Sequence, residues 1–405
     1  MDFQFFQELL SIDSTSGKER KVAEWLAERL PGMFPEANRP ALRVEEVGDG
    51  TLNLLLTWGT PRIVFCSHLD TVPPYILPTF PEGVFLSEPS LRDPSHKWAP
   101  PSYAAEGGHR FGEEHPLRET VIKGRGSCDA KGQVFAIVEA CKRLAEEGKT
   151  DFGMLLLAGE ETGSWGAKAF AKTDFRAEYL VVGEPTDNCM VAASKGTKSF
   201  DLKFTGEPFH SGYPQYGVSA VDLFMDFVNA LKAKDFGMDP VLGETTWNIG
   251  LLHSDNPQNI LSPELTCRIY FRTTFVSDEA VQQWMADAPN ALRDGRSEPA
   301  MTNNVIPGLT PSVIPGLTGN LAVSARGGDT PAKYWTVESL PAKSVAFGSD
   351  APHLKNFTHK AICGPGSITV AHRDDECVRI ADLETAVEQY LTLYAAAMST
   401  AEISK

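Results

Sequence analysis

Several features that mark special classes of protein are missing from this sequence. Positive charge is in deficit, because 37 lysine and arginine residues stand against 53 aspartate and glutamate residues, a net charge of −16. Nucleic acids and anionic membranes bind clustered basic side chains, so we expect neither as a partner. No apolar run approaches the roughly 18 residues that a membrane-spanning helix needs. With 42% hydrophobic and 22% charged residues, the composition is that of an ordinary globular protein.

The cysteines also lack the paired spacing that marks a disulfide-rich protein or a metal-binding motif. The seven cysteines are scattered, odd in number and free of CxxC spacing. This argues against a disulfide framework and favours a reducing compartment. Residues 1–6 show no basic region followed by an apolar stretch and a cleavage site, so no signal peptide is expected. We therefore predict a cytoplasmic protein.

Helix-like and strand-like runs alternate in the first half of the chain. Residues 2–30 predict a helix that is interrupted at 11–16. Further on, the pattern predicts strands at 62–67, 152–158 and 179–182 and helices at 131–147 and 163–172. Such alternation indicates an α/β domain with a mixed, largely parallel sheet.

The pattern changes near residue 190. Residues 199–204 alternate polar and apolar, which is typical of a half-exposed strand. Helices at 217–234 and 277–293 and strands at 246–252 and 264–275 complete a β-α-β-β-α order, which predicts an inserted α+β domain of the ferredoxin-like type. We expect the first domain at 1–189 and 336–405, the inserted domain at 190–298, and a Pro/Gly-rich linker at 299–335. The linker repeats Val-Ile-Pro-Gly-Leu-Thr at 305–310 and 313–318, which favours a surface loop.

Histidine or carboxylate side chains follow predicted strands or stand beside glycines in five stretches. The five stretches are His68-Leu69-Asp70, Gly124–Gly132 with Asp129, Glu160-Glu161, Gly183–Thr186 with Glu184, and Val370–Glu376 with His372. Ligands of an open α/β sheet gather at the carboxyl ends of its strands, so these side chains are expected in one cleft. Two imidazoles and several carboxylates are a suitable ligand set for zinc. One zinc uses about three protein ligands, and five ligands with one shared carboxylate serve two metals.

Taken in order, these motifs resemble those of the co-catalytic zinc metallohydrolases. This is the family of acetylornithine deacetylase, succinyl-diaminopimelate desuccinylase, aminoacylase and glutamate carboxypeptidase. The motifs cover most of the chain and are specific as a set. The resemblance implies a zinc-peptidase-like catalytic domain, an inserted lid domain that often forms a homodimer, and two zinc ions for which cobalt can substitute.

The resemblance also implies a role for each matching residue. One metal would be bound by His68, Asp129 and Glu184 and the other by Asp129, Glu161 and His372. Asp70 would orient His68, Glu160 would be the general base, and the peptide bond after Asp129 would be cis. His210, in Pro208–Gly212 of the lid, would polarise the scissile carbonyl, often in the partner subunit. The positions that match substrate-contacting ones are Asn259, Arg272, Gly348 and Ser349.

The implied reaction is the hydrolysis of an amide by a hydroxide held between two zinc ions, with Glu160 as general base. We favour an N-acyl amino acid deacylase similar to acetylornithine deacetylase, which acts in arginine biosynthesis. A di-, amino- or carboxypeptidase of the same family, acting on short peptides, is the close alternative, and a metal-free binding protein is a more distant one. The long segment 71–123, with His96, His109 and His115, leaves the substrate open because it would reshape the pocket mouth.

Overall fold

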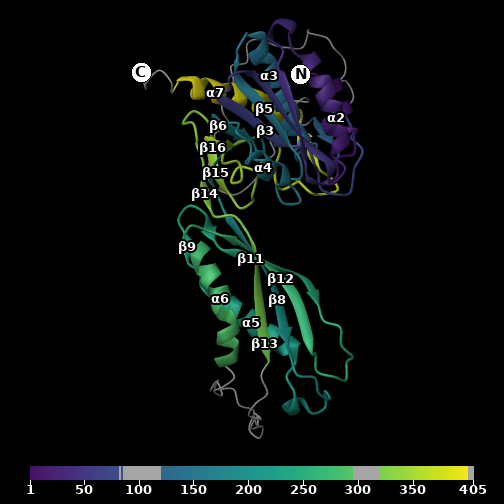
Figure 1. Cartoon of the computed structure of the whole chain (residues 1–405), viewed down its shortest axis with the longest axis vertical. Helices are drawn as coiled ribbons and strands as arrows, with labels where there is room; N and C mark the ends of the chain where they lie inside the picture. The colour runs from purple at the N-terminus through teal and green to yellow at the C-terminus, as the bar shows by residue number, and fades with distance from the viewer. Residues whose placement is uncertain (82–83, 85–119, 295–318, 400–405) are drawn as a thin grey trace, which may run out of the picture. The chain divides into compact units, whose positions relative to one another are not determined.

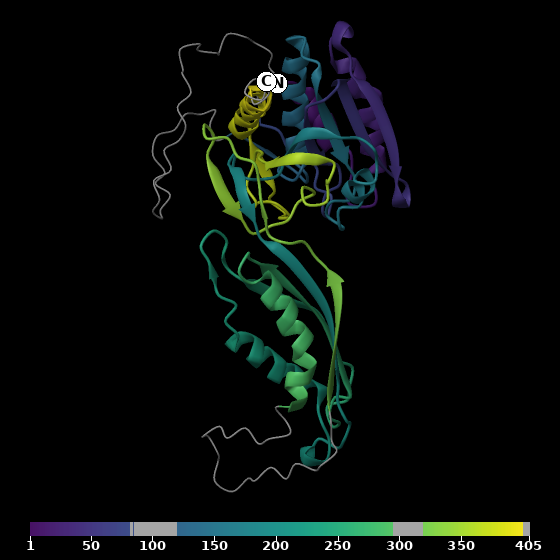
Figure 2. The same ribbon diagram turned by 60° about the vertical axis from the view of Figure 1, so that its left-hand side comes forward.

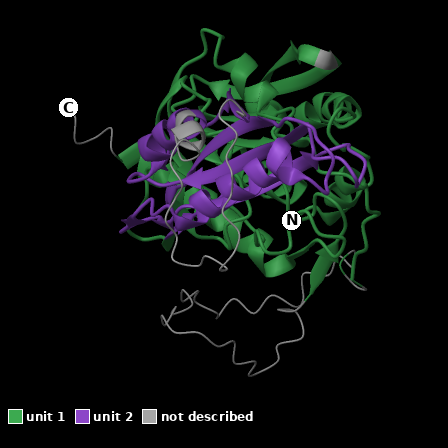
Figure 3. Ribbon diagram, turned by 90° about the horizontal axis from the view of Figure 1, so that it is seen from below, with its two compact units in different colours: residues 1–191, 334–342, 349–405 green, residues 192–333, 343–348 purple. Residues whose placement is uncertain are grey.

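The chain divides into two compact units. In this computed structural model, the described residues are 1–81, 84, 120–294 and 319–399. Unit 1 consists of residues 1–191, 334–342 and 349–405, and unit 2 of residues 192–333 and 343–348 (Figure 3). Among the helices described, none is both long enough and apolar enough to cross a membrane.

Unit 1 is built around a six-stranded sheet with the order β1-β2-β5-β3-β6-β16 (Figure 1). The strands are β1 Ala41–Val47, β2 Thr51–Gly59, β3 Ile63–His68, β5 Asp151–Leu157, β6 Ala177–Val182 and β16 Phe357–Ile362. The four strands β5, β3, β6 and β16 run parallel, and β2 and β1 join them as antiparallel neighbours. The mixed, largely parallel sheet that the sequence predicts is thus confirmed.

Helices help to bury the inner strands of this sheet. The helices of unit 1 are α1 Phe3–Leu10, α2 Arg20–Arg29, α3 Lys131–Glu146, α4 Trp165–Phe170 and α7 Ile380–Ser399. Both α3 and α7 pack against β3, and all six residues of this strand are buried. The rings of Phe6 and Phe135 stack with centroids 4.5 Å apart and so join α1 to α3. A short pair of strands, β4 Val121–Lys123 and β17 Cys377–Arg379, completes the part of unit 1 that bears on the site.

Unit 2 is a ferredoxin-like α+β domain. Its antiparallel sheet has the order β11-β12-β8-β13, and α5 and α6 cover one face (Figures 1 and 2). The elements are β8 Gly196–Thr205, α5 Ala220–Ala233, β11 Thr246–His253, β12 Glu264–Thr273, α6 Asp278–Asp294 and β13 Asn320–Gly327. Alternate residues of β8, namely Phe200, Leu202 and Phe204, are buried in the core beneath the helices. Short strands form two smaller sheets, β14-β7-β15 and β10-β9, from β7 Met190–Ser194, β9 Met238–Asp239, β10 Gly243–Glu244, β14 Ala332–Lys333 and β15 Ala342–Val345.

The segment predicted as a linker, 299–335, contains the strand β13. This strand pairs with β8 and is the fourth strand of the sheet of unit 2. Only Leu321 of β13 is fully buried, so the strand lacks the clear apolar alternation by which a strand is recognised in a sequence. Residues 343–348, expected in the first domain, belong to unit 2. The repeat at 305–318 and the three histidines at 96, 109 and 115 lie outside the described residues.

Candidate active site

The predicted ligand residues of unit 1 meet at the carboxyl edge of its sheet. His68 is the last residue of β3, Glu160 and Glu161 follow β5, and Glu184 follows β6. The strand ends are level, because His68 pairs with Leu157 at the end of β5. The loop before α3 brings in Asp129, and the loop after β16 brings in His372. Parallel strands place their carboxyl ends at one edge, which is why distant motifs converge here.

Asp129 lies between the two histidines. Its Oδ1 is 3.1 Å from Nε2 of His68, and its Oδ2 is 3.3 Å from Nε2 of His372. The Oε1 atom of Glu161 is 2.9 Å from the same Nε2 of His372. One ligand atom from each of His68, Asp129 and Glu161 lies within 4.8 Å of the others. Each oxygen of Asp129 therefore faces a different imidazole, and the peptide bond after Asp129 is cis, as expected.

The electrostatics of this cluster favour bound positive charge. Burial would lower the pKa of His68, but its hydrogen bonds with Asp129 and Asp70 raise that pKa well above the ordinary value. The hydrogen bonds with Asp129 and Glu161 raise the pKa of His372 to about 10. Burial would raise the pKa of Asp129, but the hydrogen bonds from His372 and His68 lower it. The carboxylates thus favour positive charge at both imidazoles, as they would favour a cation bound between them.

Two further carboxyl groups, those of Glu184 and Glu160, have surroundings suited to a site that holds two metal ions. Burial raises the pKa of both Glu184 and Glu160 well above the ordinary value for glutamate. Glu184 is only 5% exposed, and its Oε1 has no hydrogen-bond partner within the described ranges. A buried oxygen without a partner is costly, and a cation beside it would remove the cost. Imidazole nitrogens and carboxylate oxygens together suit zinc or a similar divalent ion.

Asp70 supports the glutamate pair as well as His68. The Nδ1 atom of His68 is 2.9 Å from the main-chain oxygen of Asp70 and 3.5 Å from its carboxylate. The carboxylate accepts the main-chain N–H groups of Glu160 at 3.0 Å and of Glu161 at 3.2 Å. The hydroxyl of Ser16 donates to the same carboxylate at 3.0 Å. The predicted support of His68 is therefore mainly through the main chain, and the carboxylate orders the two glutamates.

Three residues beside the site were not predicted as metal ligands or catalytic groups. They are Ser16, Asp350 and Glu376. Burial raises the pKa of Asp350 to about 6, and its Oδ1 has no hydrogen-bond partner in the part of the chain described. Glu376 accepts hydrogen bonds from the loop that carries Asp129. Glu376 had a signal in the sequence, since it ends the acidic stretch that follows His372. Asp350 also had one, because it follows Gly348 and Ser349 in the stretch that matches a pocket-lining loop. Ser16 had none, since it lies 54 residues from Asp70.

The two cysteines next to predicted ligands are packing residues, as expected. Cys66 and Cys128 are both buried without a disulfide. Burial raises the pKa of each thiol well above its ordinary value, so both stay protonated and neutral.

The predicted lid residues His210 and Asn259 lie side by side in unit 2. The N–H of Ser211 donates to the main-chain oxygen of Asn259 at 2.9 Å, and His210 pairs with Ile260. The exposed ring of His210 accepts the N–H of Gly212 on Nδ1 at 3.0 Å. The neutral ring therefore carries its proton on Nε2, which leaves a hydrogen-bond donor facing outward.

Arg272 is not beside this histidine. The His210 segment follows Thr205, which pairs with Glu264 at the start of β12. Arg272 lies eight residues further along β12, so roughly 25 Å of strand separates the two within unit 2. Gly348 is also in unit 2, and Ser349, in unit 1, accepts the N–H of Ala351.

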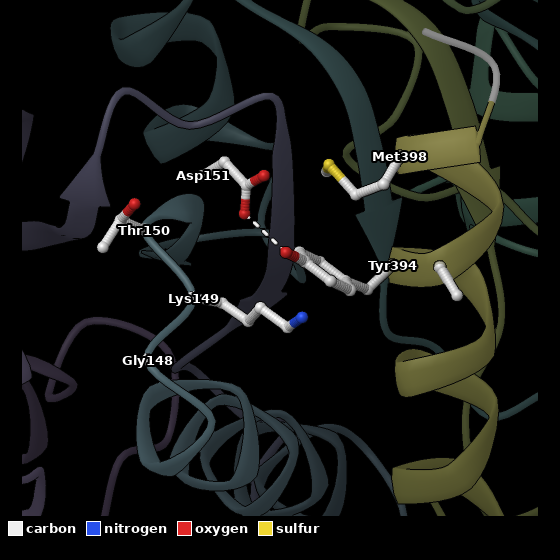
Figure 4. A pocket seen from close by; sticks show the side chains of 7 residues that line it. Gly148, Lys149, Thr150, Asp151, Tyr394 and Met398 are labelled. Atoms are coloured by element: carbon white, nitrogen blue, oxygen red, sulfur yellow. Dashed lines mark hydrogen bonds between the residues drawn. The ribbon is translucent and has the colours of Figure 1, made fainter. Parts of the chain in front are cut away.

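A separate surface pocket lies at the other end of the strands of unit 1 (Figure 4). It is lined by residues 148–151 and by Tyr394, Ala395 and Met398 of α7. Tyr394 donates a hydrogen bond to Asp151 at 2.6 Å. Since Asp151 begins β5 whereas Glu160 follows its end, this pocket is not part of the candidate active site.

The fold and the site together define a metallohydrolase with an inserted ferredoxin-like domain. Residues 101–396 match the sequence profile of peptidase family M20/M25/M40, and the chain belongs to this family. It is therefore a hydrolase that acts on amide or peptide bonds, as the sequence predicts.

Known proteins resemble this chain along nearly its whole length. A probable carboxypeptidase from Aspergillus clavatus is 27% identical over 419 residues, which cover 98% of this chain and 88% of the relative. A tripeptidase structure from Staphylococcus aureus superposes with a TM-score of 0.69 at 19% identity and covers 96% of this chain and 95% of that one. A Bacillus subtilis structure, described as a dinuclear metal-binding peptidase of the M20 family, gives a TM-score of 0.57 at 8% identity over 96% and 94%. These structures confirm the predicted fold class.

Proposed function

We propose that this protein is a metal-dependent carboxypeptidase that removes the C-terminal residue of short peptides. The contact of Asp129 with both His68 and His372 carries the proposal, because a bridging carboxylate is what a metal pair needs. The choice of a carboxypeptidase is supported by the relative of that name, which matches over 98% of this chain. The deacetylase that the sequence favoured has no support from the named relatives, which are peptidases. It is kept as the alternative that a substrate test decides.

The proposed cofactors are two zinc ions, for which cobalt can substitute. One ion would be held by His68, Asp129 and Glu184, and the other by Asp129, Glu161 and His372. When bound, such a pair lowers the pKa of an attacking water from ~15.7 toward ~7 and polarises the carbonyl group. The dinuclear neighbour from Bacillus subtilis supports two ions rather than one.

Glu160 is proposed as the general base. It accepts the proton of the attacking water and later gives this proton to the leaving amine. Burial raises the pKa of its carboxyl group, which brings that group nearer to the pH at which it must both take and release a proton. The carboxylate of Asp70 keeps Glu160 in place by accepting the main-chain N–H of Glu160.

Four residues of unit 2 (His210, Asn259, Arg272 and Gly348) and Ser349 of unit 1 are proposed to bind the substrate. The Nε2–H of His210 would donate to the carbonyl oxygen on which negative charge develops, with Asn259 beside it. Arg272 would pair with the α-carboxylate that every carboxypeptidase substrate carries. Gly348 and Ser349 would line the same pocket.

The active form is proposed to be a homodimer. His210 and Arg272 of one chain cannot both contact one small substrate, because roughly 25 Å of strand separates them. A second copy removes this difficulty, because His210 of one chain then serves the active site of the other. A closed dimer of this kind is the commonest symmetric assembly.

A substrate panel tests the function. Protein that has been chelated and reloaded with zinc or cobalt is assayed on N-blocked dipeptides, free dipeptides, and N-acetyl and N-succinyl amino acids. We expect N-blocked dipeptides to be cleaved, and amidation of their C-terminus to lower kcat/KM by about 10² or more, the scale of losing a buried charge pair. Preference for N-acetyl amino acids would establish the deacylase instead, and a need for a free amino group would establish an aminopeptidase. Absence of bound metal and of any hydrolysis would overturn both.

A further inference from the structure

The carboxylate of Glu376 accepts several hydrogen bonds from the loop that carries Asp129. Glu376 is 1% exposed. Its Oε1 accepts the main-chain N–H groups of Gly126 at 2.9 Å, Cys128 at 3.0 Å and Asp129 at 3.0 Å. A single anionic oxygen that accepts three main-chain donors fixes the course of the loop between them.

Arg125, in the same loop, binds the other oxygen of this carboxylate. Its Nη1 donates to Oε2 of Glu376 and, at 3.2 Å, to the main-chain oxygen of Arg373. Its Nε donates to the main-chain oxygen of Pro74 at 3.1 Å. Both side chains of the ion pair are buried. Removal of one partner leaves the other charge buried and unpaired, which makes the pair costly to break.

The same contacts hold the segment that carries His372. Arg373, whose oxygen Arg125 binds, directly follows this histidine. The main-chain oxygen of Glu376 accepts the N–H of Gly124 at 3.1 Å, and β17 then pairs with β4. His372 itself has a φ of 64°, a left-handed conformation that its surroundings must hold in place. Glu376 is therefore the point at which the Asp129 loop and the His372 segment are joined.

We propose that Glu376 is a positioning residue that sets the separation of Asp129 and His372 and so controls the affinity of one of the two metal positions. This inference rests on the proposed function, since it concerns the same metal pair. The position formed by Asp129, Glu161 and His372 takes two of its three ligands from the segments that Glu376 joins. The other position shares Asp129, but its His68 ends β3 and its Glu184 follows β6, and neither depends on this contact, so we expect it to be affected less.

The test compares Glu376→Gln with a matched variant, Glu178→Gln. Glu178 also accepts a hydrogen bond from an arginine, Arg62, at 2.7 Å, but it lies in β6 away from the site. Metal-free proteins are titrated with zinc by calorimetry. We expect two binding events in the wild type and in Glu178→Gln. In Glu376→Gln we expect one binding event near the wild-type affinity and one whose affinity is at least ~10-fold weaker. This is the usual loss of metal affinity when a residue that supports a metal ligand is removed.

Two further measurements separate positioning from a general loss of fold. In the metal-free state, the amides of residues 126–129 should exchange with deuterium faster in Glu376→Gln than in the wild type, with the sheet strands unchanged. Excess zinc should restore most of the kcat that the variant loses, which a misfolded chain would not allow. Glu376→Asp keeps the charge with a shorter reach, and should show the same pattern more weakly if Glu376→Gln does not fold.

The outcomes distinguish this inference from the function on which it rests. Two unchanged binding events in Glu376→Gln, or equal weakening of both, overturn the positioning role and leave the metallopeptidase intact. A wild-type protein that binds no metal overturns the proposed function and this inference together.

Discussion

The carboxylate of Asp70 accepts the main-chain N–H of Glu160 at 3.0 Å, and its second oxygen accepts the N–H of Glu161 at 3.2 Å. One carboxylate thus fixes two successive peptide groups where the chain leaves β5. Glu161 contacts His372, whereas the neighbouring Glu160 is left for another task. The shared anchor at Asp70 would allow the two adjacent glutamates to take the different roles proposed for them.

Replacement of Asp70 by asparagine should lower activity more than metal content. The asparagine side chain keeps one oxygen that can accept a hydrogen bond, but its NH2 group then faces a main-chain N–H. One of the two hydrogen bonds with Glu160 and Glu161 is therefore lost. We expect kcat to fall by about 10² with most of the zinc retained, because a misplaced general base loses much of its contribution of 10²–10⁴. Ser16→Ala is the control, since it removes a single hydroxyl contact with Asp70 and should cost under about tenfold. Equal losses in the two variants would contradict the anchoring role.

Exchange of each glutamate for glutamine should separate their roles. Glu160→Gln should keep both metals and lose at least ~10² in kcat, because an amide cannot accept the proton. Glu161→Gln should lose metal affinity, because it replaces an anionic ligand that contacts His372. Metal content by elemental analysis and kcat at saturating zinc measure the two effects. The division of labour is wrong if both variants lose the same amount of metal.

Long periodic or uniformly buried segments of the fold were predictable. The helix predicted at 131–147 is α3, Lys131–Glu146, and the run at 152–158 is β5, Asp151–Leu157. In such segments the apolar pattern and the local propensities agree. The pattern failed at β13, where the strand is largely exposed and the flanking Pro/Gly composition indicates a loop. Its place beside β8 is decided by tertiary pairing, which no local pattern contains.

The clustering of the predicted ligand residues could be foreseen from the sequence, but most of the contacts that support them could not. His68, Glu161 and Glu184 stand where predicted strands end, so local sequence and the rule for parallel sheets suffice. The hydrogen bond between Gly126 and Glu376 spans 250 residues, and only the folded chain reveals it. In the same way, a motif match assigns Arg272 to the substrate but says nothing of its distance from His210.

Gly132 should not tolerate a side chain. A Cβ atom at this position would lie 2.2 Å from the main-chain oxygen of Ser127, inside the loop that carries Asp129. Gly132→Ala must therefore displace the loop, and we expect a loss of at least about 1–3 kcal/mol in the free energy of unfolding. Gly32→Ala is the control, because nothing lies within 4 Å of its added Cβ. Urea unfolding of both variants checks this, and an equal effect would show that the loop can shift freely.

The buried lysine at the start of α3 should make stability depend on pH. Lys131 donates to the main-chain oxygens of Leu9 at 3.1 Å and Ile12 at 2.5 Å, and burial lowers its pKa from 10.5 to about 7. Between these two values the unfolded chain binds more protons than the folded one, so stability rises with pH. The penalty for the buried charge is fully present below about pH 7 and is lost as the pH approaches 10.5.

Lys131→Met should flatten this dependence. The free energy of unfolding of metal-free protein is measured from pH 7 to 9, and the slopes against pH are compared. Absolute values are not compared, because the methionine also leaves two carbonyl groups without their donor, at a cost of about 1–3 kcal/mol each. The exposed Lys21→Met variant should keep the wild-type slope. A slope in Lys131→Met equal to that of the wild type would show that the lysine does not titrate in this range.

Mixed dimers test whether His210 acts across the subunit interface. Glu160→Gln and His210→Ala should each be nearly inactive alone. If His210 serves the partner's site, a dimer of one Glu160→Gln chain and one His210→Ala chain has one site with both Glu160 and His210 intact. Random mixing makes half of the dimers mixed, so activity should recover to about a quarter of the wild type by the symmetry of a two-fold assembly. If His210 acts within its own chain, every site in the mixture carries one defect and no activity returns.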